Sequence, residues 1–179
     1  MFLDRDGVLN RAVFHGDLQG SPRSLDDLEI MPDAAAALAS LTEAGFLLIC
    51  ITNQPEVPRG QLRQQALDDI NAAVRAALPL DDLLVCAHQD SDGCDCRKPR
   101  PGLLIQGARK HGIDLGTSFM VGDRWRDVEA GAAAGCRTVL LETDYENRAP
   151  AVAPDALVQS LAEAVGWILR QTAGNQRLH

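Results

Sequence analysis

Short apolar runs alternate with longer amphipathic segments along most of the chain. Four of these runs have the length of buried strands and lie at residues 46–51, 83–86, 118–121 and 138–141, and a shorter run precedes Asp4. Helical spacing of apolar residues, with proline, aspartate or glycine at several boundaries, predicts helices at residues 34–44, 60–78, 101–111, 124–134 and 155–170. This alternation is typical of parallel strands joined by helical crossovers.

We therefore expect an α/β fold, a three-layer, doubly wound parallel sheet of the Rossmann-like type. A chain of 179 residues suits a single domain, which we place at residues 1–172, followed by a flexible tail at residues 173–179. Only three residues precede Asp4, so we expect a short first strand, and a native start upstream of Met1 stays open. In such folds ligands bind beyond the carboxyl ends of the strands, where this chain carries its polar clusters.

Composition and charge exclude several classes of partner. The formal net charge of -8 disfavours binding to nucleic acid or to an anionic membrane, because no basic patch offsets it. No apolar stretch approaches the roughly 20 residues of a membrane span, and the first residues do not resemble an export signal. We expect a soluble, cytoplasmic protein without nucleic-acid or membrane partners, and a monomer in preference to an obligate oligomer.

Two aspartates, Asp4 and Asp6, follow the first apolar run. If the backbone bends after the first, both carboxylates point into the crevice, where Asp4 could act as a nucleophile while Asp6 moves protons. Aspartate is also common in turns and helix caps, so the pair alone leaves a structural role open. Asp123 and Asp127 follow another predicted strand and favour catalysis, because a third carboxylate near Asp4 completes a suitable oxygen ligand set for Mg²⁺.

Thr52 and Lys98 follow two other predicted strands and suit the binding of a phosphoryl group. Thr52 offers a hydroxyl and an amide, and Lys98 offers a positive charge. Threonine at a strand end can also begin a turn, so its role stays open at this point. Only two of the 17 lysine and arginine residues are lysines. A lysine inside a polar cluster is therefore less easily explained as an ordinary surface residue.

A candidate metal site lies within eleven residues and consists of Cys86, His88, Cys94 and Cys96. Three thiolates and one imidazole fill a tetrahedral zinc site, which leaves no position for water and indicates a structural role for Zn²⁺. A redox pair or buried cysteines are the alternatives, but C-x-C is unusual for a redox pair and the intervening residues are polar. A zinc loop at residues 86–96 would hold Arg97 and Lys98 over the crevice.

Four short strings resemble the motifs of haloacid dehalogenase-type (HAD) phosphatases. They are FLDRDG at residues 2–7, ITNQ at 51–54, CDCRKP at 94–99 and VGD at 121–123. The similarity runs over residues 2–141 and is closest to the branch without a cap domain, which contains heptose bisphosphate phosphatases and histidinol-phosphate phosphatases. About 45 residues separate the first motif from the second, and about as many separate the second from the third, which leaves little room for a cap.

The resemblance implies a magnesium-dependent phosphatase that works through an aspartyl-phosphate at Asp4. Asp6 would protonate the leaving oxygen and then activate water. Mg²⁺ would be held by the Asp4 carboxylate, the Asp6 backbone carbonyl and Asp123. Thr52 and Lys98 would stabilise the phosphoryl group.

The resemblance also implies which residues contact the substrate, a small phosphorylated metabolite. The substrate-binding residues that it indicates are Asn53, Gln54, Arg59, Arg97 and Arg124. Arg59 lies in a segment similar to an Arg-Gly ending in the heptose enzymes, so it is a candidate for the distal phosphate. Asp127 would lie just outside the ligands of Mg²⁺ and orient Lys98 or a metal-bound water. The expected reaction is removal of the 7-phosphate of D-glycero-D-manno-heptose 1,7-bisphosphate.

Two departures from the heptose enzymes bear on the substrate, and the first, the zinc spacing, keeps histidinol phosphate open. Five residues between His88 and Cys94 resemble the spacing in histidinol-phosphate phosphatases, and Pro55 and Glu56 replace a small, glycine-containing segment of the heptose enzymes. A non-catalytic module that binds a phosphorylated ligand is an alternative of another class. The paired aspartates of the first motif argue against it, because a binding module needs no nucleophile beside an acid. The acidic composition disfavours a zinc module for nucleic acid.

Overall fold

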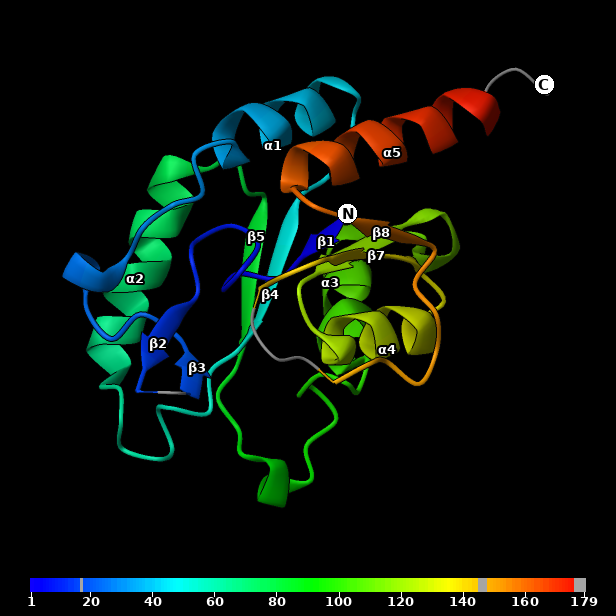
Figure 1. Ribbon diagram of the computed structural model, residues 1–179. Coiled ribbons are helices and arrows are strands. Elements are labelled where there is room, and N and C mark those ends of the chain that lie inside the picture. The colour runs from blue at the N-terminus through cyan, green and yellow to red at the C-terminus, as the bar shows by residue number, and fades with distance from the viewer. Residues whose placement is uncertain (17, 145–147, 176–179) are drawn as a thin grey trace.

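A six-stranded parallel sheet forms the centre of the molecule (Figure 1). The computed structural model describes residues 1–16, 18–144 and 148–175. The strands of this sheet are β1 (Phe2–Leu3), β4 (Ile49–Asn53), β5 (Asp82–Cys86), β6 (Phe119–Gly122), β7 (Arg137–Leu141) and β8 (Ala156–Val158). Their order is β5-β4-β1-β6-β7-β8, and every neighbouring pair is parallel.

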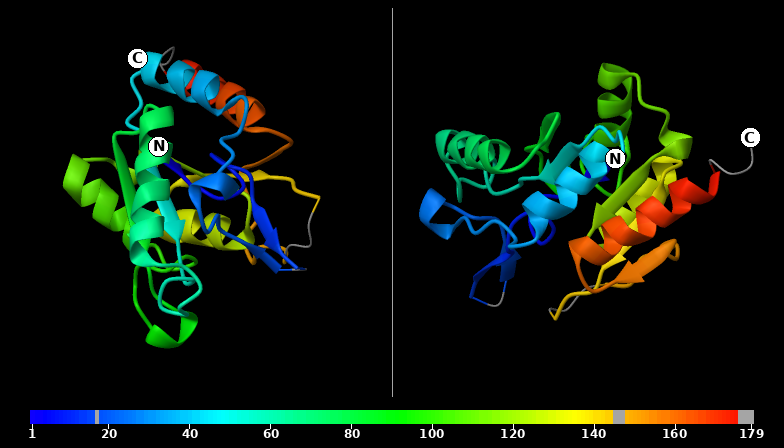
Figure 2. Two further views of the ribbon diagram at one scale, coloured as in Figure 1. Left: turned by 90° about the vertical axis from the view of Figure 1, so that its left-hand side faces the viewer. Right: turned by 90° about the horizontal axis from the view of Figure 1, so that it is seen from above.

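Helices cover both faces of the sheet (Figure 2). On one face α1 (Ala34–Glu43) packs against α5 (Leu161–Asn175), and α2 (Gln64–Ala77) contributes to the same core. On the other face α3 (Gly102–His111) packs against α4 (Trp125–Ala134). The prediction of a three-layer α/β sandwich is confirmed.

Side chains of the central strands alternate between the two cores. In β1, Leu3 belongs to the core under α1 and α5, and Phe2 belongs to the core under α3 and α4. Val121 and Met120 of β6 divide in the same way. A strand points successive side chains to opposite faces, so a strand covered on both faces needs an apolar residue at every position. These strands are therefore visible in the sequence as continuous apolar runs.

The chain adds β4 and β5 on one side of β1 and then crosses to the other side for β6, and this change of side positions the site. β4 and β5 lie on one side of β1, and β6, β7 and β8 lie on the other. Loops that leave neighbouring parallel strands in opposite directions open a crevice at their carboxyl ends. Asp4 follows β1, Asn53 ends β4 and Asp123 follows β6, so three predicted site residues reach this crevice.

The segment between β1 and α1 contains a hairpin that was not predicted. Its antiparallel strands are β2 (Val13–His15) and β3 (Leu18–Gly20), and a short 3-10 helix, η1 (Leu25–Asp27), follows. Strands of three residues are too short to give a periodic signal. No second globular unit is inserted among the described residues, as expected for a fold without a cap.

The C-terminal boundaries differ from the prediction. Residues 156–158, expected within the last helix, form the edge strand β8, and α5 begins at Leu161. Three consecutive apolar residues fit the helical period and the strand period equally well. Pairing with β7 makes this segment a strand. α5 continues to Asn175, so part of the predicted tail is helical, and residues 176–179 lie outside the described residues. No helix in the described ranges has the length and apolar character needed to cross a membrane.

Candidate active site

Asp4 lies directly after the buried strand β1, where the loops diverge. Its backbone amide donates to the Val121 carbonyl at 2.9 Å, which extends the pairing of β1 with β6. Its Oδ1 atom is 2.6 Å from Nζ of Lys98. The two residues are 94 positions apart in the sequence, so the fold brings the first and third motifs into direct contact.

Lys98 is held between two carboxylates below the protein surface. Its Nζ atom lies 2.6 Å from Oδ1 of Asp4 and 2.6 Å from Oδ1 of Asp127, and it donates to the Ile51 carbonyl at 3.1 Å. Burial would lower the pKa of the Lys98 ammonium, but the charges of Asp127 and Asp4 outweigh burial and raise it. Lys98 therefore stays protonated at neutral pH.

Three carboxylates beside this ammonium form a candidate metal site. One oxygen atom from each of Asp4, Asp123 and Asp127 lies within 4.8 Å of the other two, and all three residues are buried. Burial raises the pKa of Asp4, Lys98 lowers it and the neighbouring aspartates raise it again, so the net shift is upward. A divalent cation would offset this repulsion and favour the ionised carboxylates, so the donor set fits Mg²⁺.

Gly122 provides the space in which Asp127 reaches this cluster. A Cβ atom at position 122 would lie 2.1 Å from Cβ of Asp127 and 2.4 Å from its Oδ2. The same Oδ2 atom accepts a hydrogen bond from the backbone amide of Arg124 at 3.1 Å, at the start of α4. Any larger residue at position 122 would displace the Asp127 carboxylate.

Asp6 lies in a dense hydrogen-bond network. Its carboxylate accepts hydrogen bonds of 2.9–3.1 Å from Arg5, Asn10, Ser21 and Gln54. Burial raises the pKa of Asp6, but the charge of Arg5 and these hydrogen bonds lower it, and the net shift is downward. The network orients Asp6 and favours its carboxylate form.

The end of β4 contributes three neighbouring residues to the site. Thr52 lines the cavity described below. Asn53 holds the backbone of Lys98, because its Oδ1 accepts from the Lys98 amide at 3.1 Å and its Nδ2 donates to the Lys98 carbonyl at 3.0 Å. Gln54 is 0% exposed, and its amide donates to Asp6 and Thr52 at 2.9 Å each. This corrects the expectation that Gln54 contacts substrate, since it lies behind the cavity wall.

A cavity of about 260 Å³ opens at this site and is lined mainly by charged side chains. It reaches Asp4, Asp6 and Lys98. It also reaches a group of four arginines that we call the outer arginines, Arg59, Arg97, Arg124 and Arg126. A volume near the lower end for ligand pockets, with this lining, suits a small and strongly charged ligand.

Asp90 is a carboxylate that interacts electrostatically with three of the outer arginines. It accepts hydrogen bonds from Nε of Arg97 at 2.8 Å and from Nη2 of Arg97 at 3.5 Å. The hydrogen bond from Arg97 lowers the pKa of Asp90 against the effect of burial, and the charges of Arg97, Arg126 and Arg59 lower it further. Arg59 is exposed, whereas Arg124 and Arg126 are half-buried.

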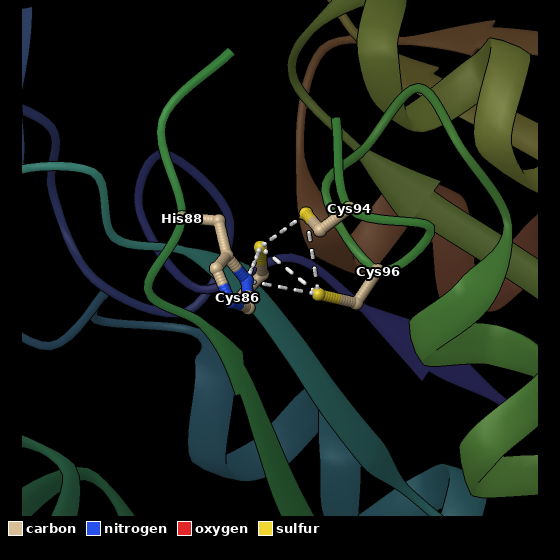
Figure 3. Close-up of side chains that lie close together, drawn as sticks. All are labelled: Cys86, His88, Cys94 and Cys96. Carbon is tan, nitrogen blue, oxygen red and sulfur yellow. Dashed lines mark hydrogen bonds between the residues drawn. The ribbon is translucent and has the colours of Figure 1, made fainter. Parts of the chain in front are cut away.

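The four predicted zinc ligands point toward one another (Figure 3). The sulfur atoms of Cys86, Cys94 and Cys96 are 3.3–3.7 Å apart. Nδ1 of His88 lies 3.5 Å from the sulfur of Cys86 and 3.3 Å from that of Cys96. Atoms at about 2.3 Å from a tetrahedral centre are roughly 3.7 Å apart, so the cluster has the donors and nearly the spacing of a structural zinc site.

The zinc loop is also fixed at the start of α3. Gly102 donates its amide to the Asp95 carbonyl at 3.0 Å, and a Cβ atom at Gly102 would lie 2.3 Å from that carbonyl oxygen. Arg100 donates to the Cys94 carbonyl at 2.6 Å. Arg97 and Lys98 lie between these two anchors, so the loop controls where both side chains enter the cavity.

Known proteins with similar sequences are bacterial phosphatases. The chain is 35% identical to the D-glycero-beta-D-manno-heptose-1,7-bisphosphate 7-phosphatase of Pseudomonas aeruginosa and 36% identical to that of Bordetella bronchiseptica. Each alignment spans 148 residues and covers 80% of both chains. A family model described as HAD-hydrolase-like matches residues 95–164. The chain belongs to the HAD phosphatase family.

Solved structures of HAD phosphatases share the fold of this chain. The D,D-heptose 1,7-bisphosphate phosphatase from B. bronchiseptica, complexed with magnesium and phosphate, has a TM-score of 0.77 at 28% identity and covers 96% of this chain and 98% of its own. A putative HAD-like phosphatase from Mesorhizobium loti has a TM-score of 0.74 at 26% identity, with coverages of 94% and 83%. As a member of this family, the chain is a phosphoric monoester hydrolase.

Three residues of this HAD site were not found from the sequence. Ser21 donates to Oδ2 of Asp6 at 2.9 Å from the segment after β3, where no motif occurs. Asp90 lies among the polar residues of the zinc loop, which gave no reason to single it out. Arg126 lies two positions after Arg124, and this second basic residue after the fourth motif was the one available signal.

Proposed function

We propose that this HAD phosphatase removes the 7-phosphate of D-glycero-D-manno-heptose 1,7-bisphosphate through an aspartyl-phosphate at Asp4. The observation that carries the chemistry is Nζ of Lys98, 2.6 Å from both Asp4 and Asp127 at the edge of a charged cavity. The outer arginines give the same cavity a second group of positive charges, which suits a substrate with two phosphates. The names of the sequence relatives support this substrate.

In the first half-reaction, a carboxylate oxygen of Asp4 attacks the phosphorus atom, and the bond from phosphorus to the sugar oxygen breaks. Asp6 enters this step in its protonated form, although its hydrogen bonds favour the carboxylate, and gives its proton to that oxygen, so the sugar leaves as an alcohol. Lys98 and Thr52 hold the phosphoryl oxygens, on which negative charge must be stabilised. Asp6 is left as a carboxylate, the form that its hydrogen bonds from Ser21 and other donors stabilise.

In the second half-reaction, Asp6 accepts a proton from a water molecule while the oxygen of that water attacks the phosphorus. The bond from phosphorus to Asp4 breaks and inorganic phosphate leaves. Asp4 returns to its carboxylate form and Asp6 returns to its protonated form, so the cycle is closed. Ser21 and Gln54 keep the Asp6 carboxylate in place during both proton transfers.

Two metal ions belong to this proposal. Mg²⁺, when bound, would supply positive charge to the phosphoryl oxygens. The residues that would hold it are Asp4, Asp6 through its backbone carbonyl, and Asp123, with Asp127 next to them as the partner of Lys98. Zn²⁺ would be structural, because Cys86, His88, Cys94 and Cys96 leave no open position for water.

The test is release of inorganic phosphate, with Mg²⁺ present, from both anomers of heptose 1,7-bisphosphate and from histidinol phosphate. We expect a preference for one heptose bisphosphate and loss of turnover in Asp4→Asn, which keeps the shape of the side chain but lacks the nucleophilic charge. Absence of Asp4-dependent turnover on any of these phosphoesters would contradict the proposed chemistry and favour the binding module.

Histidinol phosphate is the second candidate substrate. The short spacing between His88 and Cys94 favours it, and Glu56 lines the cavity, where its carboxylate could pair with an ammonium group. A preference for histidinol phosphate in the same assay would transfer the assignment to this reaction while leaving the roles of Asp4 and Asp6 intact.

A further inference from the structure

Arg126 lines the substrate cavity, although no motif assigns it a role. It is the second residue of α4, and its guanidinium carbon lies 4.9 Å from the centre of the Trp125 ring. Stacking on an aromatic ring restrains an arginine without neutralising its charge. The side chain is therefore held beside the cavity as a full positive charge.

Asp90 and Asp127 attract Arg126 through their charges, but Nε of Arg126 has no hydrogen-bond acceptor within the described ranges. Arg97 differs, because Asp90 accepts hydrogen bonds from its Nε and Nη2 atoms. Two donors nevertheless remain buried without an acceptor among these residues, Nη1 of Arg97 and Nε of Arg126. Buried donors in proteins nearly always have an acceptor, so this pair indicates a ligand that brings one.

The charge of this part of the cavity also calls for an anion. Among the charged residues that line the cavity, Asp4 and Asp127 are paired with Lys98, and Asp6 is paired with Arg5. The four outer arginines and two acids, Asp90 and Glu56, remain, which leaves an excess of two positive charges. A phosphate dianion carries the matching charge, and its oxygen atoms fit the planar donor pairs of guanidinium groups. Lys98, in contrast, is already paired with Asp4 and Asp127.

We infer that Arg126, together with Arg97, binds the phosphate that the enzyme does not transfer, and so determines the preference for a bisphosphate. This inference rests on the proposed function and assigns a residue to its second phosphate. Arg126 is better suited to this task than Arg59, because Arg59 is exposed and would lose more side-chain freedom on binding.

The test compares Arg126→Gln with the unchanged protein on two substrates that differ only in the second phosphate, heptose 1,7-bisphosphate and heptose 7-phosphate. We expect KM for the bisphosphate to rise about tenfold or more with kcat within about threefold, because the lost hydrogen bonds bind ground state and transition state alike. For heptose 7-phosphate, kcat/KM should change by less than about twofold. Arg126→Lys keeps the charge without the planar fork and should give an intermediate KM.

Arg109→Gln, on the exposed surface of α3, is the matched control and should behave like the unchanged protein. Melting temperature and zinc content are measured for every variant, and R126K answers the same question if R126Q does not fold. Equal losses on both substrates, or no loss on either, would overturn the inference. A failure of the proposed function is distinguishable, because the unchanged protein would then show no preference for the bisphosphate.

Discussion

Lys98, Asp4 and Asp127 carry charges that are buried together beside the cavity, and each charge depends on the others for its partner. The side chains of Lys98, Asp4 and Asp127 are 2%, 10% and 2% exposed. A buried charge that loses its partner is strongly destabilising, whereas the intact pair contributes little beyond offsetting its own desolvation. Substitution of one member therefore changes stability as well as chemistry, and the two effects must be measured separately.

Lys98→Met should lower the free energy of unfolding by about 3 kcal/mol or more in magnesium-free buffer, because Asp4 and Asp127 are left without their ammonium. Asp127→Asn removes one of the two carboxylate charges that Lys98→Met leaves without a partner. The double variant should therefore lose less than the sum of the single losses, by more than about 0.5 kcal/mol, in urea unfolding. Additive losses would show that the pair is not energetically coupled.

Asp82 makes a separate, acid-sensitive contribution at the other end of the sheet. Its Oδ2 atom lies 2.8 Å from Nε2 of His111 and 2.8 Å from Nζ of Lys110, and Arg75 is 3.6 Å from its Oδ1. Burial raises the pKa of Asp82, but the hydrogen bonds from His111 and Lys110 outweigh burial and lower it to about 2. The folded state therefore stabilises the carboxylate.

A carboxyl group with a lowered pKa stabilises the fold above its unfolded pKa of about 3.9 and loses this effect as the pH falls toward its folded pKa. Allowing for the exposure of Lys110, the unchanged protein should be about 1–2 kcal/mol more stable than Asp82→Asn at pH 6. The difference should shrink between about pH 4 and pH 2. A difference that does not vary with pH in unfolding experiments would contradict this assignment.

Among the elements, the zinc loop has the greatest influence on the site. It begins at the end of β5, carries Asp90, and leads into Arg97 and Lys98 before α3 begins. The hydrogen bonds of its short 3-10 helix, residues 90–92, are too few to fix a polar loop of this length. The four-ligand cluster is therefore the feature that defines its position.

Cys94→Ser should abolish stoichiometric zinc binding and loosen the loop, because three ligands cannot close the tetrahedral site. We expect faster hydrogen exchange in residues 87–98 and a higher KM, since Arg97 loses its fixed position. Zinc content, hydrogen exchange and phosphatase kinetics measure the three effects. Cys136→Ser is the matched control, because Cys136 is buried outside the cluster, and full zinc retention in C94S would contradict the ligand assignment.

For the whole molecule, the described surface offers no reason to expect a stable dimer. The large apolar side chains that are well exposed among the described residues lie in five different segments, three on secondary-structure elements and two in loops: Phe14, Leu25, Leu157, Leu47 and Val152. Single exposed apolar residues are normal, and interfaces require contiguous patches. The cavity is lined by the proposed nucleophile Asp4, the proposed acid Asp6, Lys98 and the outer arginines, all from one chain.

We therefore predict a monomer that is active alone. Light scattering after size exclusion should give the mass of one chain over the concentrations used for assays, and specific activity should not depend on enzyme concentration. A dimer whose dissociation removes activity would contradict this prediction and would place part of the site on a second copy.

Prediction from the sequence was most successful where chemistry depends on neighbouring residues. The cysteine cluster lies within eleven residues, so its spacing indicated a metal site, and the structure groups the same four side chains. Asp4 and Asp6 share one motif, but their proposed role also needed Asp123, Asp127 and the resemblance to HAD phosphatases. Continuous apolar runs identified the central strands, because those strands are buried on both faces. β8 was missed because its three residues carry no period of their own.

The sequence by itself determined the α/β class, the order of the main elements and the residue types of the catalytic and zinc clusters, because these follow from local spacing. Only the tertiary structure decided where each side chain points. In the folded protein Gln54 is buried and does not line the cavity, and Ser21 donates a hydrogen bond to Asp6. Arg126 lines the same cavity as the other three outer arginines. Those directions depend on packing between segments distant in sequence, which no local pattern contains.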